Sequence, residues 1–123
     1  MTMVPVMRDE TIIEVWVNCP DKSAAADIAE AIIGERLAAA ANFHPTISSR
    51  YHWKGSIESA QEIPLLFKTR QSLFAALARR IAELHPYETP SIIGKEVRHA
   101  NASYRAWIIE ETKERSNDED HDC

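Results

Sequence analysis

The stretch FHPTISSRYHWKGSIESAQEIPLLFKT, residues 43–69, decides how this chain is expected to fold. Residues 43–54 read as one extended segment and residues 57–69 as a strand, with Lys54-Gly55-Ser56 between them as a turn signal. One face of the second strand carries Ile63, Leu65 and Phe67. The stretch therefore predicts a long hairpin. Pro64 cannot donate a ladder hydrogen bond, so we expect it at an edge position or a bulge.

The segments on either side of the hairpin predict a fold of the α+β class. Residues 11–19 alternate as a strand does, and residues 22–41 form an Ala-rich helical stretch interrupted by Gly34. After the hairpin we expect a helix at 71–85, a strand at 91–98 and a last short helix at 102–114. The order β-α-β-β-α-β plus a C-terminal helix is the ferredoxin-like split βαβ sandwich, with two helices on one face of an antiparallel sheet. This fold hosts many functions and by itself selects none.

The net charge of the chain comes from its C-terminal end. The 123 residues hold 14 Lys and Arg against 19 Asp and Glu, a net charge of −5. Residues 1–109 hold 12 of each sign, whereas residues 110–123 hold seven acids and two bases. We therefore divide the chain into a lead-in (1–10), a single domain (11–112) and a flexible acidic tail (113–123). A neutral body has no basic surplus for nucleic acid, so no nucleic-acid partner is expected.

The sequence also indicates a cellular setting. No apolar run approaches the ~18–20 residues that span a bilayer, so we expect no membrane association. Met1 to Glu10 lacks the basic start and apolar stretch of a secretory signal. The cysteines are Cys19 and Cys123, the last residue of the acidic tail, so a disulfide framework is not expected. These features favour a reducing cytoplasm.

Aromatic and charged residues of the hairpin and the later segments are the candidates for an inter-subunit cleft. The aromatic ones are Tyr51, Trp53, Tyr87, Tyr104 and Trp107. Two interpretations are open for them: a ligand-stacking cleft, or packing between subunits, where Trp and Tyr supply large buried area. Lys68, with Glu62 and Glu88, forms either a charged pocket for a small anion or metal, or an ion pair. No nucleophile or base is identified, so no catalytic residue and no enzymatic activity are expected.

Several short motifs, in order, resemble the CutA family of divalent-cation tolerance proteins. They are RLAAAANFHP (36–45), SRYHWKG (49–55), FKT (67–69), HPYETP (85–90) and YRAW (104–107). The resemblance covers about residues 11–110. It implies a ferredoxin-like subunit in a tight homotrimer, cytoplasmic in bacteria, which pairs its long hairpins between subunits. It further implies tolerance to copper and other divalent metals, copper binding and no established reaction. The shape is similar to the PII signalling trimers, which suggests small-ligand sensing by analogy.

The family resemblance also directs the search for metal ligands, and here the chain departs from the pattern. Where relatives carry Cys or His, this sequence has Val17, Ala40 and Leu84, and only His85 remains. Cys19 lies on the same strand face as Val17 and is the candidate soft ligand beside His85. For His85 the alternative is a helix C-cap, and for Cys19 a small semi-buried thiol. Among the other histidines, His44 and His52 lie roughly 26 Å apart on an extended strand and cannot share one ion within a subunit.

The leading functional expectation is a non-enzymatic CutA-like homotrimer that binds copper or another divalent cation and responds to metal ions. A hairpin of this length has edges that one small subunit cannot cover, and pairing between subunits removes them. The alternative is a PII-like small-ligand sensor that acts through clefts between subunits. No organic cofactor is indicated, and the sequence does not identify a downstream partner.

Overall fold

The computed structural model describes residues 10–113 and contains five strands and three α-helices in that range. The first strand and the helix layer are β1 (Ile12–Cys19), α2 (Lys22–Gly34) and α3 (Phe74–Leu84), the last preceded by a short 3-10 turn, η1 (Gln71–Leu73). The remaining elements are β2 (Ala40–Phe43), β3 (Ile47–Trp53), β4 (Ser56–Arg70), β5 (Ile92–Glu96) and α4 (Ala102–Glu111).

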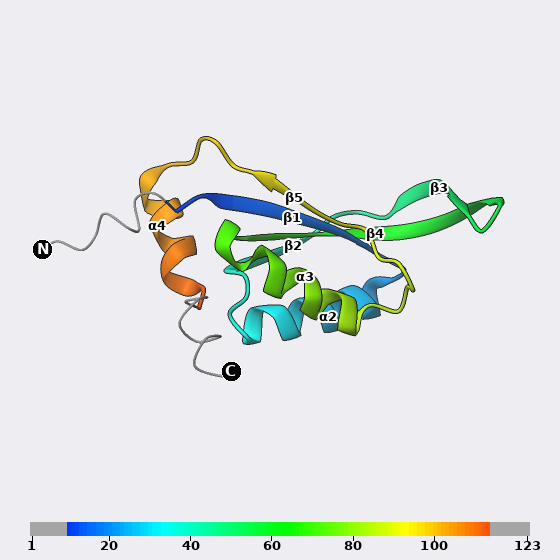
Figure 1. Cartoon of the computed structure of the whole chain (residues 1–123), viewed down its shortest axis with the longest axis horizontal. Helices are drawn as coiled ribbons and strands as arrows, with labels where there is room; N and C mark the ends of the chain where they lie inside the picture. The colour runs from blue at the N-terminus through cyan, green and yellow to red at the C-terminus, as the bar shows by residue number, and fades with distance from the viewer. Residues whose placement is uncertain (1–9, 114–123) are drawn as a thin grey trace, which may run out of the picture.

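The sheet is antiparallel throughout and is centred on β4. The strand order is β2-β4-β1-β5, and β3 pairs with the outer half of β4. Helices α2 and α3 lie side by side along one face of the sheet (Figure 1). The predicted α+β class, the antiparallel sheet and the element order are confirmed, with the second predicted strand divided into β2 and β3.

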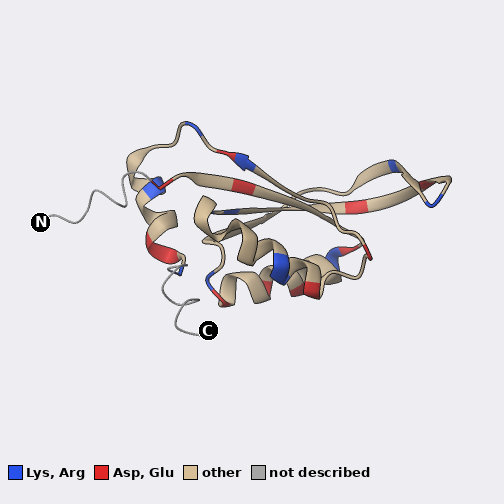
Figure 2. Cartoon of the chain, viewed as in Figure 1, with Lys and Arg blue, Asp and Glu red and all other residues tan. Residues whose placement is uncertain are grey.

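The core lies between the sheet and the helix pair. The inward residues of β1 and β4 alternate as predicted, and Val15, Leu65 and Phe67 are completely buried. They pack against Ile28 and Ile32 of α2 and against the buried residues Leu73, Leu77 and Ile81. Burial of this apolar surface is the main stabilisation of the body. Figure 2 shows basic and acidic residues interspersed over the helices and strands of the body.

Helix α2 ends earlier than the sequence predicted. It stops at Gly34 instead of Ala41, because Arg36 takes a left-handed conformation with φ 59°. The Arg36 N–H donates to Ile33 O at 3.0 Å and the Leu37 N–H to Ile32 O at 3.1 Å, which is the Schellman pattern of helix termination. Of the alanines that follow, Ala40 and Ala41 belong to strand β2, and Ala38 and Ala41 pack against the core. The prediction was wrong because helix propensity is a weak prior against tertiary packing.

The junction between β2 and β3 contains the predicted bulge. Phe43 of β2 pairs with Leu65, whereas Ile47 of β3 pairs with Glu62. Residues 44–46 therefore face only residues 63–64, so one strand has one residue more than the other. Pro64 lies at this point, where its missing N–H breaks no regular ladder, and its carbonyl accepts from the His44 N–H at 2.9 Å. The bulge expected for Pro64 is confirmed.

Beyond the bulge the hairpin leaves the rest of the sheet. Strand β1 pairs with β4 only from Ile63 to Arg70, so the segment Ile47–Glu62, here called the ribbon, has two strands and two free edges. Figure 1 shows the ribbon projecting past the helix layer. Its tip is a two-residue turn in which Lys54 (φ 50°) and Gly55 (φ 85°) are both left-handed, as a type I′ turn requires. Ile57 at the ribbon's end is 70% exposed.

The C-terminal helix α4 closes the other end of the molecule. Ile108 and Ile109 are buried against Ile12 and Tyr104 packs against the same cluster, whereas Trp107 is 39% exposed. Arg70 binds the residues that follow α4: it donates to Thr112 O at 2.9 Å and to Lys113 O at 2.7 Å. Residue 113 is thus bonded to the body, although the tail was predicted to begin there. The lead-in before residue 10 and the tail from residue 114, with His121 and Cys123, lie outside the described residues.

Candidate functional site

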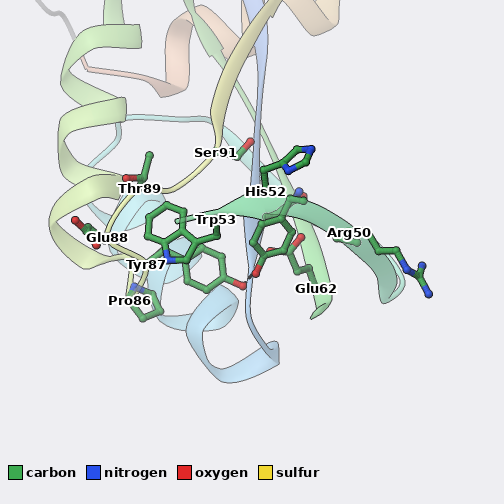
Figure 3. A pocket seen from close by; sticks show the side chains of 12 residues that line it. Arg50, His52, Trp53, Glu62, Pro86, Tyr87, Glu88, Thr89 and Ser91 are labelled. Atoms are coloured by element: carbon green, nitrogen blue, oxygen red, sulfur yellow. Dashed lines mark hydrogen bonds between the residues drawn. The ribbon is translucent and has the colours of Figure 1, made fainter. Parts of the chain in front are cut away.

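A groove of about 730 Å³ lies between strand β3 of the ribbon and the loop that follows α3 (Figure 3). Its walls come from β3, from Glu62 of β4, from the end of β1 and from residues 86–91. The lining residues are Asn18, Ser49, Arg50, Tyr51, His52, Trp53, Glu62, Pro86, Tyr87, Glu88, Thr89 and Ser91. Five of the eight residues predicted for a cleft meet here: Tyr51, Trp53, Glu62, Tyr87 and Glu88. The volume falls within the usual range of ~300–1,000 Å³ for small-molecule sites.

The polar centre of the groove is a hydrogen bond between Tyr87 and Glu62. The Tyr87 hydroxyl donates to Glu62 Oε2 at 2.9 Å, and Glu62 is only 5% exposed (Figure 3). Desolvation raises the pKa of Tyr87 above its usual value, and the hydrogen bond to the carboxylate raises it further. The hydroxyl therefore stays protonated at neutral pH and remains a donor to Glu62.

His85 positions the loop that carries Tyr87. Its ring Nδ1 accepts from the Tyr87 backbone N–H at 3.1 Å, so the proton lies on Nε2, which donates to Asn18 O at 2.8 Å. The imidazole thereby ties the end of α3 and the start of the loop to β1. His85 is the C-cap residue of α3, as the alternative expected, and its backbone N–H donates to Ile81 O at 2.8 Å, but its ring bonds to a strand carbonyl and not to the terminal carbonyls of the helix. Both ring nitrogens are used, so His85 offers no free lone pair to a metal in this arrangement.

Residues 10–113 do not fit a metal centre within one chain. Cys19 is completely buried in the core, and burial raises the pKa of its thiol to about 11, so the thiolate that a metal needs is disfavoured. Within residues 10–113, no three His, Cys, Asp or Glu side chains are grouped to hold an ion. The metal-ligand role predicted for His85 and Cys19 stays a prediction.

The structure separates the three charged residues that were expected to form one pocket. Lys54, not Lys68, faces Glu88, with Nζ–Oε1 at 3.5 Å and both side chains largely exposed. Lys68 lies six residues along β4 from Glu62, roughly 20 Å away on an extended strand. Its Nζ is 5.7 Å from the ring centroid of Tyr104, so it belongs to a different cluster.

That second cluster lies beside α4. Tyr104 and Trp107 stack with ring centroids 5.6 Å apart and planes inclined by 20°. Lys68, Tyr104 and Trp107 therefore form an aromatic and cationic patch at the end of the sheet away from the ribbon. The eight predicted cleft residues thus divide five to three between two places in one subunit.

Sequence reasoning missed several residues of the groove. Asn18 contributes its backbone carbonyl to His85, and no sequence pattern indicates such a role. Arg50 and His52 alternate with Tyr51 and Trp53 along β3, and their strand position was the available signal. Thr89 and Ser91 lie in the loop after Pro86, where only the fold determines which side chains reach the groove.

None of the helices between residues 10 and 113 is both long enough and apolar enough to cross a membrane. Residues 13–111 match the family described as CutA1 divalent ion tolerance protein.

Relatives agree with this match in sequence and in structure. The mouse protein named Protein CutA is 39% identical over 83% of this chain, which spans 58% of the mouse protein's length. A crystal structure of CutA1 from Pyrococcus horikoshii has a TM-score of 0.79 at 40% identity, covering 83% of this chain and 99% of that one. A structure described as the periplasmic divalent cation tolerance protein CutA from Archaeoglobus fulgidus has a TM-score of 0.76 at 29% identity, covering 79% and 94%. The chain belongs to the CutA1 divalent ion tolerance protein family.

Proposed function

We propose that this protein is a non-enzymatic homotrimer of ferredoxin-like subunits that acts in tolerance to divalent cations. The family description supports the connection with divalent cations. The single observation that carries the assembly is the ribbon, which leaves the body with two free edges and exposes Ile47, Tyr51 and Ile57 at 39%, 38% and 70%. A two-stranded ribbon is marginal in water on its own, and free edges invite pairing with another chain. Neighbouring subunits are the partners we propose for it.

The outer face of the sheet supports the same proposal. Leu66, Trp16 and Ile93 are cross-strand neighbours in one row on the side that α2 and α3 do not cover. Ile93 is 56% exposed in the single subunit. A second copy packed on this row would bury it, as obligate oligomers bury apolar surface.

The assembly is tested by light scattering on the purified protein. We expect the mass of three chains for the wild type, and a smaller species for Ile57→Lys, because a charge would have to be buried at the ribbon contact. The matched control is Ile33→Lys, which places the same lysine at an exposed isoleucine of α2. A monomeric wild type, or an Ile57→Lys variant that keeps the wild-type mass, would contradict the proposal.

Copper or zinc binding is proposed only for the assembled protein, since one described subunit does not group suitable ligands. Calorimetric titration of the wild type, His85→Ala and Cys19→Ser with Cu²⁺ and Zn²⁺ tests the two predicted ligands. Circular dichroism of each variant checks that it remains folded. A dissociation constant above about 1 mM, or the same dissociation constant for the wild type and both variants, would contradict a metal site at His85 and Cys19.

The second candidate function is a small-ligand sensor, and the groove is the observation that favours it. An aromatic-lined hollow with a buried carboxylate is a better ligand site than any grouping of metal donors within residues 10–113. As a sensor, the trimer would change its conformation when the ligand binds, and a partner protein would bind one of the two conformations. A rise in melting temperature with an organic ligand but not with metal ions would favour the sensor.

The cytoplasm is the proposed location. A buried free thiol at Cys19 is compatible with a reducing compartment. Fractionation of cells that make the full-length protein distinguishes the cytoplasm from the periplasm named for the Archaeoglobus relative.

A further inference from the structure

Glu62 is a buried carboxylate that lacks a cationic partner. It is 5% exposed and lies at the base of the groove. Between residues 10 and 113, its carboxylate makes no ion pair with a Lys, Arg or His within 4.0 Å, and its one side-chain hydrogen bond is with the neutral Tyr87 hydroxyl. A buried charge is costly unless an opposite charge meets it. The groove therefore holds a negative charge that a bound cation would compensate.

The other charged groups of the groove do not supply that cation. Lys54 is exposed at the mouth and faces Glu88 at 3.5 Å. Figure 3 shows the Arg50 side chain extending away from Glu62 and Tyr87. His52 also lines the groove but forms no ion pair with Glu62. Arg50 and His52 thus line the groove without pairing with Glu62.

The walls next to Glu62 are aromatic. Tyr51, Trp53 and Tyr87 all line the groove, and Figure 3 shows Trp53 beside Tyr87. The face of an aromatic ring attracts ammonium and guanidinium groups, and attracts them more strongly when water is excluded. A metal ion would instead need several oxygen, nitrogen or sulfur donors, which are not grouped here within residues 10–113. The groove of about 730 Å³ is also far larger than a single ion.

We propose that this groove binds an organic cation with an ammonium or guanidinium head, held by Glu62 as counter-charge and by the rings of Tyr51, Trp53 and Tyr87. The Tyr87 hydroxyl fixes the carboxylate through Oε2, which leaves Oε1 for the cation. His85 supports the site indirectly by holding the loop of Tyr87. This site does not require metal binding, so the choline experiment tests it independently of the proposed metal binding.

Calorimetric titration of the full-length protein with choline chloride tests the site. The neutral isostere 3,3-dimethylbutan-1-ol has the same shape without the charge, and sodium chloride matches the ionic strength. We expect saturable choline binding, with the neutral alcohol at least about tenfold weaker, because the charge supplies the charge-assisted and cation–π contacts. Absence of saturation up to about 10 mM choline, or equal binding of the alcohol, overturns the proposal.

Two variants assign the contacts. Glu62→Gln keeps a side chain that can accept from Tyr87 but removes the charge, and we expect about tenfold weaker choline binding. Trp53→Phe followed by Trp53→Leu should weaken binding in two steps, as the ring first shrinks and then disappears. Glu30→Gln on α2 removes the same charge from an exposed position outside the groove and should leave binding unchanged.

The choline titrations can fail or succeed independently of the proposed trimer and of metal binding. Unchanged choline binding in Glu62→Gln overturns this site even if the protein is trimeric and binds copper. A lysine or arginine of a neighbouring subunit in the groove would block choline in the wild-type trimer, which overturns the small-ligand site while supporting the assembly. Choline binding without any metal binding supports the site alone.

Discussion

The two halves of strand β4 lie in opposite environments although they form one continuous strand. From Ile63 to Arg70 the strand pairs with β1 and, over Leu65–Lys68, also with β2, and it buries most of its residues, including Phe67 at 0% exposure. From Ser56 to Gln61 it pairs only with β3 and is almost wholly exposed, with Ile57 at 70%. The inner half is stabilised by the core of its own chain. The stability of the outer half depends on the contacts that the ribbon makes outside that core. Strand formation here follows from neighbours more than from local sequence.

Truncation of Phe67 is the strongest test of the inner half. Phe67→Ala removes a fully buried ring between the sheet and the helices, and we expect the free energy of unfolding to fall by about 3–5 kcal/mol. Chemical denaturation followed by far-UV circular dichroism measures it. Ile57→Ala is the comparison in the outer half: its 70% exposure in the single chain predicts a loss within about 0.5 kcal/mol if nothing covers the ribbon. Because the proposed trimer buries Ile57, we expect a larger loss, about 2 kcal/mol or more. A loss within about 0.5 kcal/mol would contradict the burial of Ile57 by a neighbouring subunit.

A substitution at the hairpin tip should affect the outer half alone. Gly55 has φ 85°, and the space where a Cβ would lie is open, so Gly55→Ala introduces backbone strain without a clash, about 1–2 kcal/mol. Hydrogen exchange should become faster in the ribbon amides and stay unchanged in the β1–β4 pairs. Lys54→Gly, at the neighbouring left-handed position with φ 50°, should have the opposite effect on the same amides. Faster exchange in β1 would mean that the two halves are not independent.

The smallest expected effect concerns a pH-dependent ion pair between α2 and α3, here called the clamp. Arg80 of α3 donates through Nε and Nη2 to the Glu35 carboxylate at 3.0 Å, which joins the C-terminal end of α2 to α3. This hydrogen bonding, more than the attraction of the charges, lowers the pKa of Glu35 below the usual 4.5. Because the folded pKa is the lower one, the stabilisation is present above pH 4.5 and is lost as the pH falls through the folded value.

The clamp is measured by the melting temperature over about pH 3–7 for the wild type and Glu35→Gln. The variant should melt slightly lower at neutral pH, by a small fraction of the Phe67→Ala effect, and the two curves should converge in acid. The exposed pair is screened by solvent, which keeps the difference small. Glu30→Gln serves as the control, and a gap between the wild type and Glu35→Gln that widens in acid would contradict the assignment.

The sequence predicted the element order, the hairpin and the alternating core residues because each depends on local periodicity. It misplaced the end of α2, since termination depends on one left-handed residue, Arg36, that propensity does not identify. For the site, the sequence identified Tyr51, Trp53, Glu62, Tyr87 and Glu88 as candidates but could not separate them from the α4 cluster. That separation follows from strand register, and the His85–Asn18 bond depends on a backbone carbonyl that carries no side-chain signal.

The extra residue between β2 and β3 decides which chemistry the groove presents. In β2, odd-numbered residues lie opposite odd-numbered residues of β4, as with Phe43 and Leu65. In β3, odd-numbered residues lie opposite even-numbered ones, as with Tyr51 and Glu58, which brings the aromatic residues to the side of Glu62. A regular ladder continued from the Phe43–Leu65 pair through the unchanged sequence would place Ile47 opposite Gln61 and would turn Arg50 and His52 to the face of Glu62. The bulge at residues 44–46 is therefore itself a specificity determinant: the same sequence paired without it would present the basic residues of β3, and not the aromatic ones, on the side of Glu62.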